Sequence, residues 1–481
     1  MNRSFRFLLA AAVCATVVGC GHRPTGYQTV EETITTRGGF AGILENGVFH
    51  DVLYNPESVA LTFPGYIVGL DKGRHHDVGK DAVYPALDES EEAGLRRVKR
   101  RMKDEPKLHY VSHIVRNEGK AFGEGNCVLY SIYSDWGAAS QGALAGDAPG
   151  IPCNGGPLQV GEHASAQAQS WKALASFRDE IRRAVAGKSG TSAYSHVVLV
   201  VMGWNTPQIE AVRNFNAIAA QIKHASGSAQ FAPLFVGVTW PSVWTAQWLD
   251  PAIKLVSYRA KANDADEVGT IWISQVADIL QEAAPKNAQL VAIGHSFGAR
   301  ALFSAVCSRN VWGKTSATNR KWDTVIGWQP AFSINRFAEG GSGDGFEYGQ
   351  ACLDRAETII LTASEHDAAV DNAIWADMIG SYASWKSVCP PDSAAKKKLL
   401  SEPNCIFADQ VTATSVSQVP IARGRINYLD ASMIVHFNQP NTGGGAHSDI
   451  YRSVHGRLNW HAMDSKLSTR QQVQGSASAQ D

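Results

Sequence analysis

Several well-known classes of protein are excluded by what this 481-residue sequence lacks. Its 44 basic and 45 acidic side chains leave a formal net charge of −1, so no global field attracts nucleic acid, and no basic segment interleaved with aromatics stands out. The chain carries no P-loop, dinucleotide fingerprint, EF-hand or H-E-x-x-H pattern. We therefore expect no nucleic-acid partner, no cofactor and no metal.

The apolar run near the N-terminus is too short to cross a bilayer as a stable helix. It spans residues 7–18 (FLLAAAVCATVV) and follows Arg3 and Arg6. This pattern is typical of a secretory signal peptide, which we expect over residues 1–19 and expect to be removed.

The residues around the expected cleavage point carry a second signal. Val17, Val18, Gly19 and Cys20 resemble the lipobox of bacterial lipoproteins, and that resemblance implies cleavage before Cys20 and lipidation of its thiol. Gly21 follows, instead of the aspartate that resembles an inner-membrane retention signal. We therefore expect an outer-membrane lipoprotein of the bacterial envelope, facing the periplasm or the cell surface and held by several acyl chains. The alternative is that the protein is secreted with Cys20 unmodified.

Cysteines are few, and none shows C-x-x-C metal spacing. Of the eight, Cys14 lies in the expected signal peptide and Cys20 at the expected anchor. An even number remains, which suits disulfides formed in an oxidising periplasm. The six candidates are Cys127, Cys153, Cys307, Cys352, Cys389 and Cys405. Pairing of neighbours along the chain would close the shortest loops, but the sequence does not fix the pairing, and buried free thiols are the alternative.

No internal repeat is apparent, so we divide the chain by where strand and helix patterns begin to alternate. Residues 20–165 mix short apolar pieces with many glycines, and we treat them as a separate N-terminal region of unknown function. Residues 166–465 are expected to form the main domain, and the polar residues 466–481 a disordered tail.

From about residue 190, strand and helix patterns alternate, which is typical of a parallel sheet wrapped by helices. Strands are expected at 196–202, 233–240, 289–296, 324–328, 358–363 and 433–437, with helices at 210–225 and 267–283. The predicted class is therefore α/β, with a mostly parallel sheet flanked by helices.

The segment AQLVAIGHSFGARALFSAV, residues 288–306, is the most informative part of the sequence. It places Ser296 between Gly294 and Gly298 at the point where an apolar strand should turn into a helix. A serine on such a tight turn exposes its Oγ, and any Cβ at the flanking glycines would collide with neighbouring backbone. We interpret Ser296 as a nucleophile, with a buried turn serine as the alternative.

A serine nucleophile needs an imidazole as base and an acid that orients it. Residues 357–367 (ETIILTASEHD) form an apolar strand that ends in a loop holding Glu365 and Asp367. Functional residues of an open parallel sheet gather at the carboxyl ends of its strands. The short Asp367 side chain suits the orienting role, so we predict it as the acid. Glu365, Asp371 and Asp430 remain alternatives.

The base is expected in the segment NTGGGAHSDIYRS, residues 441–453, where His447 follows three glycines. A glycine-rich loop lets an imidazole reach the carboxyl edge of the sheet without fixed strand geometry. We predict His447 as the base. The competing histidines are His295, interpreted as facing away from the serine, His436, interpreted as a core histidine of the strand at 433–437, and His366, His455 and His461.

The order serine, acid, histidine, together with the turn at Ser296, resembles the α/β-hydrolase superfamily, in particular a bacterial esterase/lipase-like branch. The resemblance covers roughly residues 190–462 and rests on the segments VVMGWNTP, TWPS, AIGHSFGAR, TASEHD and GAHSDIY. It implies an α/β-hydrolase fold for residues 166–465, with the N-terminal region as an addition. Met202 stands before Gly203, where that branch often has histidine.

Acyl transfer also needs backbone N–H groups aimed at the negative charge of the tetrahedral intermediate. Phe297, directly after the serine, is the expected first donor. The resemblance implies a second donor, Trp204, in the loop after the opening strand, with Asn205 bracing that loop. An ordinary loop is the alternative reading of residues 203–205.

The sequence thus predicts a membrane-anchored serine hydrolase that cleaves an ester-type bond through Ser296, His447, Asp367 and an acyl-enzyme intermediate. The expected substrate is a small-molecule or lipid ester, and the membrane is reached through lipidated Cys20. A catalytically inactive lipoprotein of the same fold, acting as an envelope binding or scaffold protein, is the alternative.

Three tryptophans lie at helical spacing after a strand end, and for them core packing is favoured over an acyl pocket. These are Trp240, Trp244 and Trp248.

Overall fold

The structure is a computed structural model that describes the chain in segments. These are residues 60–72, 109–120, 124–131, 153, 166–186, 194–203, 206, 208–227, 231–240, 262–307, 320–338, 341, 346–371, 377–399, 401–438 and 445–464. The expected signal peptide, Cys20 and the expected tail lie outside the described residues. Within these segments, no helix combines the length and the apolar character that crossing a bilayer requires.

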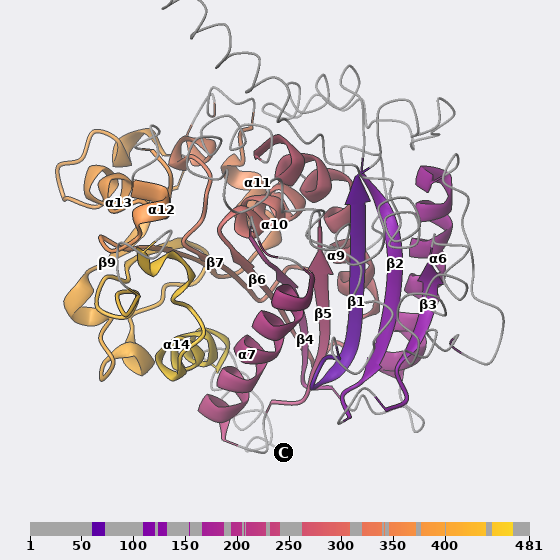
Figure 1. Cartoon of the computed structure of the whole chain (residues 1–481). Coiled ribbons are helices and arrows are strands. Elements are labelled where there is room, and N and C mark those ends of the chain that lie inside the picture. The colour runs from indigo at the N-terminus through magenta and orange to yellow at the C-terminus, as the bar shows by residue number, and fades with distance from the viewer. Residues whose placement is uncertain are drawn as a thin grey trace, which may run out of the picture.

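The described strands form one sheet of ten strands in the order β3-β2-β1-β5-β4-β6-β7-β8-β10-β9 (Figure 1). All neighbours from β1 to β9 in this order are parallel. The strands are β1 Pro64–Lys72, β2 His109–Glu118, β3 Cys127–Ser131, β4 His196–Val201, β5 Pro233–Thr239, β6 Gln289–His295, β7 Thr324–Trp328, β8 Ile359–Ala363, β9 Asn404–Ile406 and β10 Ile426–Asp430. The predicted α/β class, with a mostly parallel sheet flanked by helices, is confirmed.

The chain reverses its direction across the sheet at β4. The strand before it in the order is β5 and the strand after it is β6, and both are parallel to it. Val201 at the end of β4 pairs with Gly294 near the end of β6. The segments that follow these two strands therefore meet at one carboxyl edge, which is where open α/β sheets bind ligands.

Helices cover both faces of the sheet (Figure 1). α7 and α14 pack against each other on one face, while on the other face α9 contacts both α6 and α10. The helices are α6 Ala166–Ala186, α7 Gln208–Ser226, α9 Ser274–Ala283, α10 Phe297–Cys307, α11 Gly349–Arg355, α12 Ala368–Asp371, α13 Tyr382–Val388 and α14 Ser453–Asp464. Because both faces are covered, β4, β5 and β6 are buried throughout, which explains their unbroken apolar runs.

The sheet extends into the region that the sequence sets apart. β1 pairs in parallel with β5, and β2 and β3 continue the sheet in antiparallel fashion. The described part of residues 20–165 therefore contributes strands to the sheet rather than lying beside it. β1 is hard to recognise in the sequence because two of its residues are glycines that close packing requires. A Cβ at Gly65 would meet the Phe235 backbone, and a Cβ at Gly69 would meet the His113 ring.

The last strand of the main domain is not where the sequence places it. β10 spans Ile426–Asp430, and residues 433–437 lie in a turn that follows it. Ser432 starts this turn by donating from both its N–H and its Oγ to Asp430 Oδ1, at 3.0 and 2.6 Å. The prediction of a strand there was wrong because the apolar run belongs to a turn in which Met433 and Phe437 are exposed.

The six candidate cysteines form three neighbour pairs. These are Cys127–Cys153, Cys307–Cys352 and Cys389–Cys405, with Cα–Cα distances of 4.9, 4.3 and 5.5 Å. The second pair joins α10 to α11 and the third joins the end of α13 to β9. The six candidates thus lie in pairs at disulfide distance, and the pairing that the sequence left open is between neighbours along the chain.

A buried charge network anchors helix α10, which starts directly after Ser296. Asp266 is fully buried and accepts hydrogen bonds from Arg300 of α10 at 2.5 Å and from both Nη atoms of Arg336 at 2.9 and 3.0 Å. Ser304 Oγ donates to the same carboxylate at 3.0 Å. The two guanidinium groups hold the pKa of Asp266 far below its usual range, against the opposing effect of burial. Three segments distant in the sequence are fixed together here.

This network predicts that Asp266→Asn is strongly destabilising, because two buried guanidinium groups lose the carboxylate that they share. The expected loss is about 3–5 kcal/mol in the free energy of unfolding, measured by urea denaturation. Asp179→Asn on the exposed side of α6 is the matched control, and its expected effect is below about 1 kcal/mol. Similar losses in the two variants would contradict the prediction.

Buried histidines predict a loss of stability in acid. His196 lies at the start of β4 against the rings of Phe231 and Trp460, at 5.1 and 5.7 Å between centroids. Burial lowers the pKa of His196 to about 4, and that of His455 in α14 to about 4 as well. Each stays neutral in the folded protein at pH 5 but is protonated in the unfolded chain, where histidine titrates near pH 6.5.

The unfolded state therefore binds more protons, and the free energy of unfolding falls as the pH drops from about 6.5 toward 4. For His196 the expected loss between pH 7.5 and pH 5 is about 2 kcal/mol. Urea denaturation of the wild type and of His196→Phe, which retains an aromatic ring, measures it. The variant should lose about 2 kcal/mol less over this interval, and an equal dependence on pH in both proteins would refute the assignment.

Candidate active site

Ser296 lies in a strained turn between β6 and α10. Its φ of 55° is in the left-handed region, which non-glycine residues rarely adopt. Two main-chain contacts hold the turn in place: Ser296 N–H donates to the Trp328 carbonyl at 3.0 Å, and Ala331 N–H donates to the Ser296 carbonyl at 3.2 Å. The segment after β7 thus holds the turn from both sides. The strand-to-helix junction is where the sequence predicts it, but Ser296 as a residue is buried, with 6% of its surface exposed, whereas the sequence interpretation expected an exposed serine.

The two flanking glycines allow this turn to form. A Cβ at Gly294 would lie 2.5 Å from Ala299 Cα, and one at Gly298 would lie 2.5 Å from the Met202 carbonyl carbon. In both cases the obstacle is backbone, which cannot move aside as a flexible side chain can. The predicted collisions are therefore those found in the structure.

The segment after β4 closes over the same turn. Gly203 lies so near to Ser296 that a Cβ on it would be 2.7 Å from Ser296 Cβ and 3.3 Å from Ser296 Oγ. Buried Trp240 fixes this segment by donating from Nε1 to the Met202 carbonyl at 2.9 Å. Trp204 and Asn205 lie outside the described residues, as do Trp244 and Trp248. Trp240 itself has the packing role that the sequence favours.

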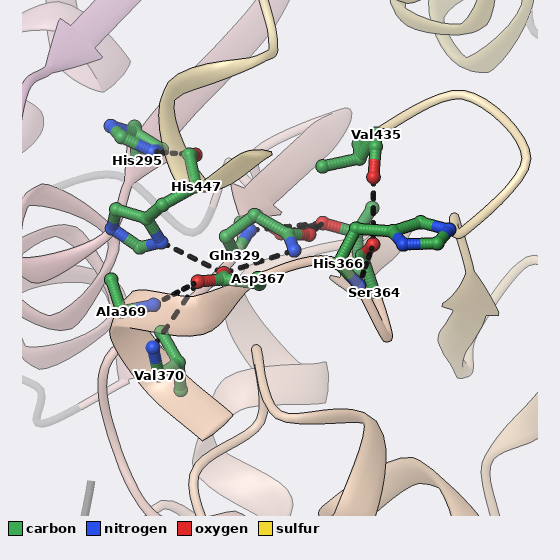
Figure 2. Close-up of polar contacts among 11 residues, drawn as sticks. His295, Gln329, Ser364, His366, Asp367, Ala369, Val370, Val435 and His447 are labelled. Carbon is green, nitrogen blue, oxygen red and sulfur yellow. Dashed lines mark hydrogen bonds and ion pairs between the residues drawn. The ribbon is translucent and has the colours of Figure 1, made fainter. Parts of the chain in front are cut away.

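Asp367 and His447, which are 80 positions apart in the chain, are hydrogen-bonded. His447 Nδ1 lies 2.8 Å from Asp367 Oδ2, as Figure 2 shows. The same Oδ2 accepts from Gln329 Nε2 at 3.1 Å, while Oδ1 accepts from the N–H groups of Ala369 and Val370 at 3.1 and 3.2 Å. Asp367 is fully buried, whereas 14% of the His447 side chain is exposed. The open side of the pair is therefore the imidazole.

His447 also contacts the residue that precedes Ser296. Its carbonyl accepts from His295 Nε2 at 2.9 Å, and the two rings lie 4.8 Å apart (Figure 2). A second contact, from Ala446 N–H to the His366 carbonyl at 3.0 Å, ties the histidine segment to the end of β8. Serine, acid and histidine thus lie at one edge of the sheet. The described residues show no hydrogen bond between Ser296 Oγ and His447.

His295 does not face away from this site, contrary to the sequence interpretation. Burial, together with the neighbouring His447, lowers its pKa to about 3, against the opposing effect of the carbonyl that it contacts. It is therefore neutral at physiological pH and donates from Nε2 to the His447 carbonyl. The sequence pattern could not reveal this, because the contact comes from a segment 152 positions away.

The alternative acids have other partners. Glu365 is exposed and lies 3.5 Å from His366 Nε2. Asp430 is bonded to Ser432, and burial raises its pKa. Asp371 ends helix α12, and its side chain lies outside the described residues.

The alternative histidines are engaged elsewhere or exposed. His455 and His461 each contact a main-chain carbonyl through Nε2, at Ile434 and Val419 respectively. His436 is exposed beside His366, so its interpretation as a core histidine was wrong. His447 is the histidine whose ring contacts Asp367 among the described residues.

Comparisons with known proteins add little to this geometry. No protein-family model matches the chain, and no curated protein sequence is similar to it. Among solved structures, a metagenomic carboxyl esterase is similar over 58% of this chain and 77% of its own, with 14% sequence identity and a TM-score of 0.25. A TM-score of that size supports no conclusion by itself.

The packing at the turn predicts that Gly298→Ala is destabilising. Its Cβ would press on the backbone at the end of β4, so the expected loss is about 2–4 kcal/mol in the free energy of unfolding. Gly227→Ala is the control: its φ is 63° but nothing lies within 4 Å, so only backbone strain of about 1 kcal/mol is expected. Chemical denaturation compares the two, and an equal or smaller effect at Gly298 would disprove the steric argument.

Proposed function

We propose that this protein is a serine hydrolase that cleaves ester-type bonds, with Ser296 as nucleophile, His447 as general base and Asp367 as the acid that orients it. The observation that supports this most is the Asp367–His447 pair held against the residue next to a serine in left-handed conformation. With Nδ1 engaged by the carboxylate, the imidazole has its other nitrogen available to take a proton.

In the proposed reaction, Ser296 Oγ attacks the carbonyl carbon of the ester while its proton passes to His447 Nε2. The carbonyl electron pair moves to oxygen, and in this proposal the Phe297 N–H at the start of α10 stabilises the resulting oxyanion. Collapse of this intermediate breaks the bond to the leaving alcohol, which takes the proton from His447. Water then attacks the acyl-enzyme by the same sequence and releases the acid.

The second oxyanion donor belongs to the segment after β4 in this proposal. The contact between Gly203 and Ser296 brings that segment to the nucleophile, which supports the N–H of Trp204 as the donor.

We further propose that Cys20 is lipidated and anchors the enzyme in a bacterial envelope. Three cysteine pairs at disulfide distance support an oxidising compartment.

The test is covalent labelling with a fluorophosphonate, which reacts with activated serines. The wild type should be labelled and Ser296→Ala should not, with hydrolysis of p-nitrophenyl esters falling at least about 10⁴-fold. Ser226→Ala, at the end of α7, is the control and should be labelled like the wild type. Folded wild-type protein without labelling or esterase activity would reject the proposal in favour of an inactive binding or scaffold protein.

A profile of ester chain lengths on the mature protein then separates a lipase from a short-chain esterase. The rates on acetyl, butyryl, octanoyl and palmitoyl esters give the preferred chain length directly, because a pocket that buries more methylene groups gains about 0.8 kcal/mol for each.

A further inference from the structure

Gln329 is a residue that the proposed reaction does not use, and its conformation is unusual. It follows β7, is fully buried and has a φ of 44°. Among the described residues, only Ser296 and Gln329 combine a side chain with a positive φ. Such a conformation costs about 1–3 kcal/mol and persists only where the surroundings impose it. Glycine would adopt this conformation without that cost. The presence of glutamine therefore indicates a role for its side chain.

The side chain of Gln329 reaches the proposed acid. Its Nε2 donates to Asp367 Oδ2 at 3.1 Å (Figure 2). Its Oε1 accepts from Thr362 Oγ1 at 2.7 Å. The orientation of the amide follows from chemistry, since an ionised carboxylate has only acceptors and must be met by the NH₂ end. Gln329 N–H also donates to Thr362 Oγ1 at 2.9 Å, which fixes the residue at both ends.

The oxygen that Gln329 contacts is the one that orients His447. Asp367 Oδ2 receives Gln329 Nε2 and His447 Nδ1, while Oδ1 is held by the main chain of α12. Among the described residues, the Gln329 amide is the contact that this carboxylate receives from the segment after β7. A neutral amide makes this contact without adding a second negative charge.

Gln329 also sits within the clasp around the nucleophile. Trp328, directly before it, and Ala331, two positions after it, form hydrogen bonds with the main chain of Ser296. A short segment, residues 328–331, therefore contacts the serine through its backbone and the acid through the Gln329 side chain. A shift of this segment would move both groups together.

From this geometry we infer that Gln329 is a positioning residue that keeps the Asp367 carboxylate aligned on His447 and in register with Ser296. The inference rests on the proposed function and deepens it. Gln329 touches neither substrate nor the reacting atoms, so its effect passes through Asp367.

Two near-isosteric substitutions separate positioning from simple packing. Gln329→Leu keeps the volume but removes the donor, so kcat on a p-nitrophenyl ester should fall about 10- to 100-fold while KM stays within about threefold. Gln289→Leu, a buried glutamine at the opposite end of β6, is the matched control and should leave kcat within about twofold of the wild type.

Gln329→Glu gives a readout that packing alone would not move. Two carboxyl groups at hydrogen-bond distance share one proton, so a protonated Glu at 329 donates to Asp367 as the amide does. Near pH 6 its kcat should approach that of the wild type. As the pH rises and the proton is lost, repulsion between the carboxylates should lower the ratio of variant to wild-type kcat about tenfold or more by pH 9. Other titratable groups near the pair are present in both proteins, so the ratio removes the part of their pH dependence that the substitution leaves unchanged; they are His295, His366, His447, Glu365 and Asp430.

The outcomes are distinct. The positioning role is overturned if Gln329→Leu retains the wild-type kcat, or if the ratio of Gln329→Glu to wild-type kcat does not change with pH. In either case, labelling at Ser296 would still support the hydrolase proposal. Absence of labelling in the wild type removes the hydrolase proposal and this inference with it. Should Gln329→Leu fail to fold by circular dichroism, the pH dependence of Gln329→Glu still decides.

Discussion

The main-chain clasp on Ser296 is the constraint on which the rest of this structure depends. A serine at φ 55° is unfavourable by itself, and the carbonyl of Trp328 and the N–H of Ala331 hold it there. Because the clasp comes from the end of β7, the nucleophile is fixed to the neighbouring strand as well as to its own. Gly294 and Gly298 make the turn possible, but they do not impose it.

The same edge of the sheet assembles the other groups. β8 ends in the segment with Asp367, and the segment after β10 returns with His447. Behind the serine, the network of Asp266 with Arg300 and Arg336 fixes the start of α10. A rigid frame of this kind suits catalysis, because stabilising charge in a transition state requires donors that are already in place.

The sequence was informative where chemistry depends on local pattern. The glycines around Ser296, the strand end before Asp367 and the glycine-rich segment before His447 each carry a steric or topological reason that can be recognised without coordinates. It was uninformative where long-range contacts decide. β1 is obscured by Gly65 and Gly69, the apolar run at 433–437 is a turn governed by Asp430 and Ser432, and a glutamine carries no local signal for the left-handed conformation of Gln329.

The central claim, that Ser296 and His447 act together, is tested most directly by a crystal structure of the protein after reaction with a fluorophosphonate. The account predicts phosphorus bonded to Ser296 Oγ, the phosphoryl oxygen within about 3 Å of the Phe297 N–H, and His447 Nε2 turned toward the adduct with Nδ1 still on Asp367. An adduct on another residue, or a Ser296 adduct that His447 does not reach, would contradict it.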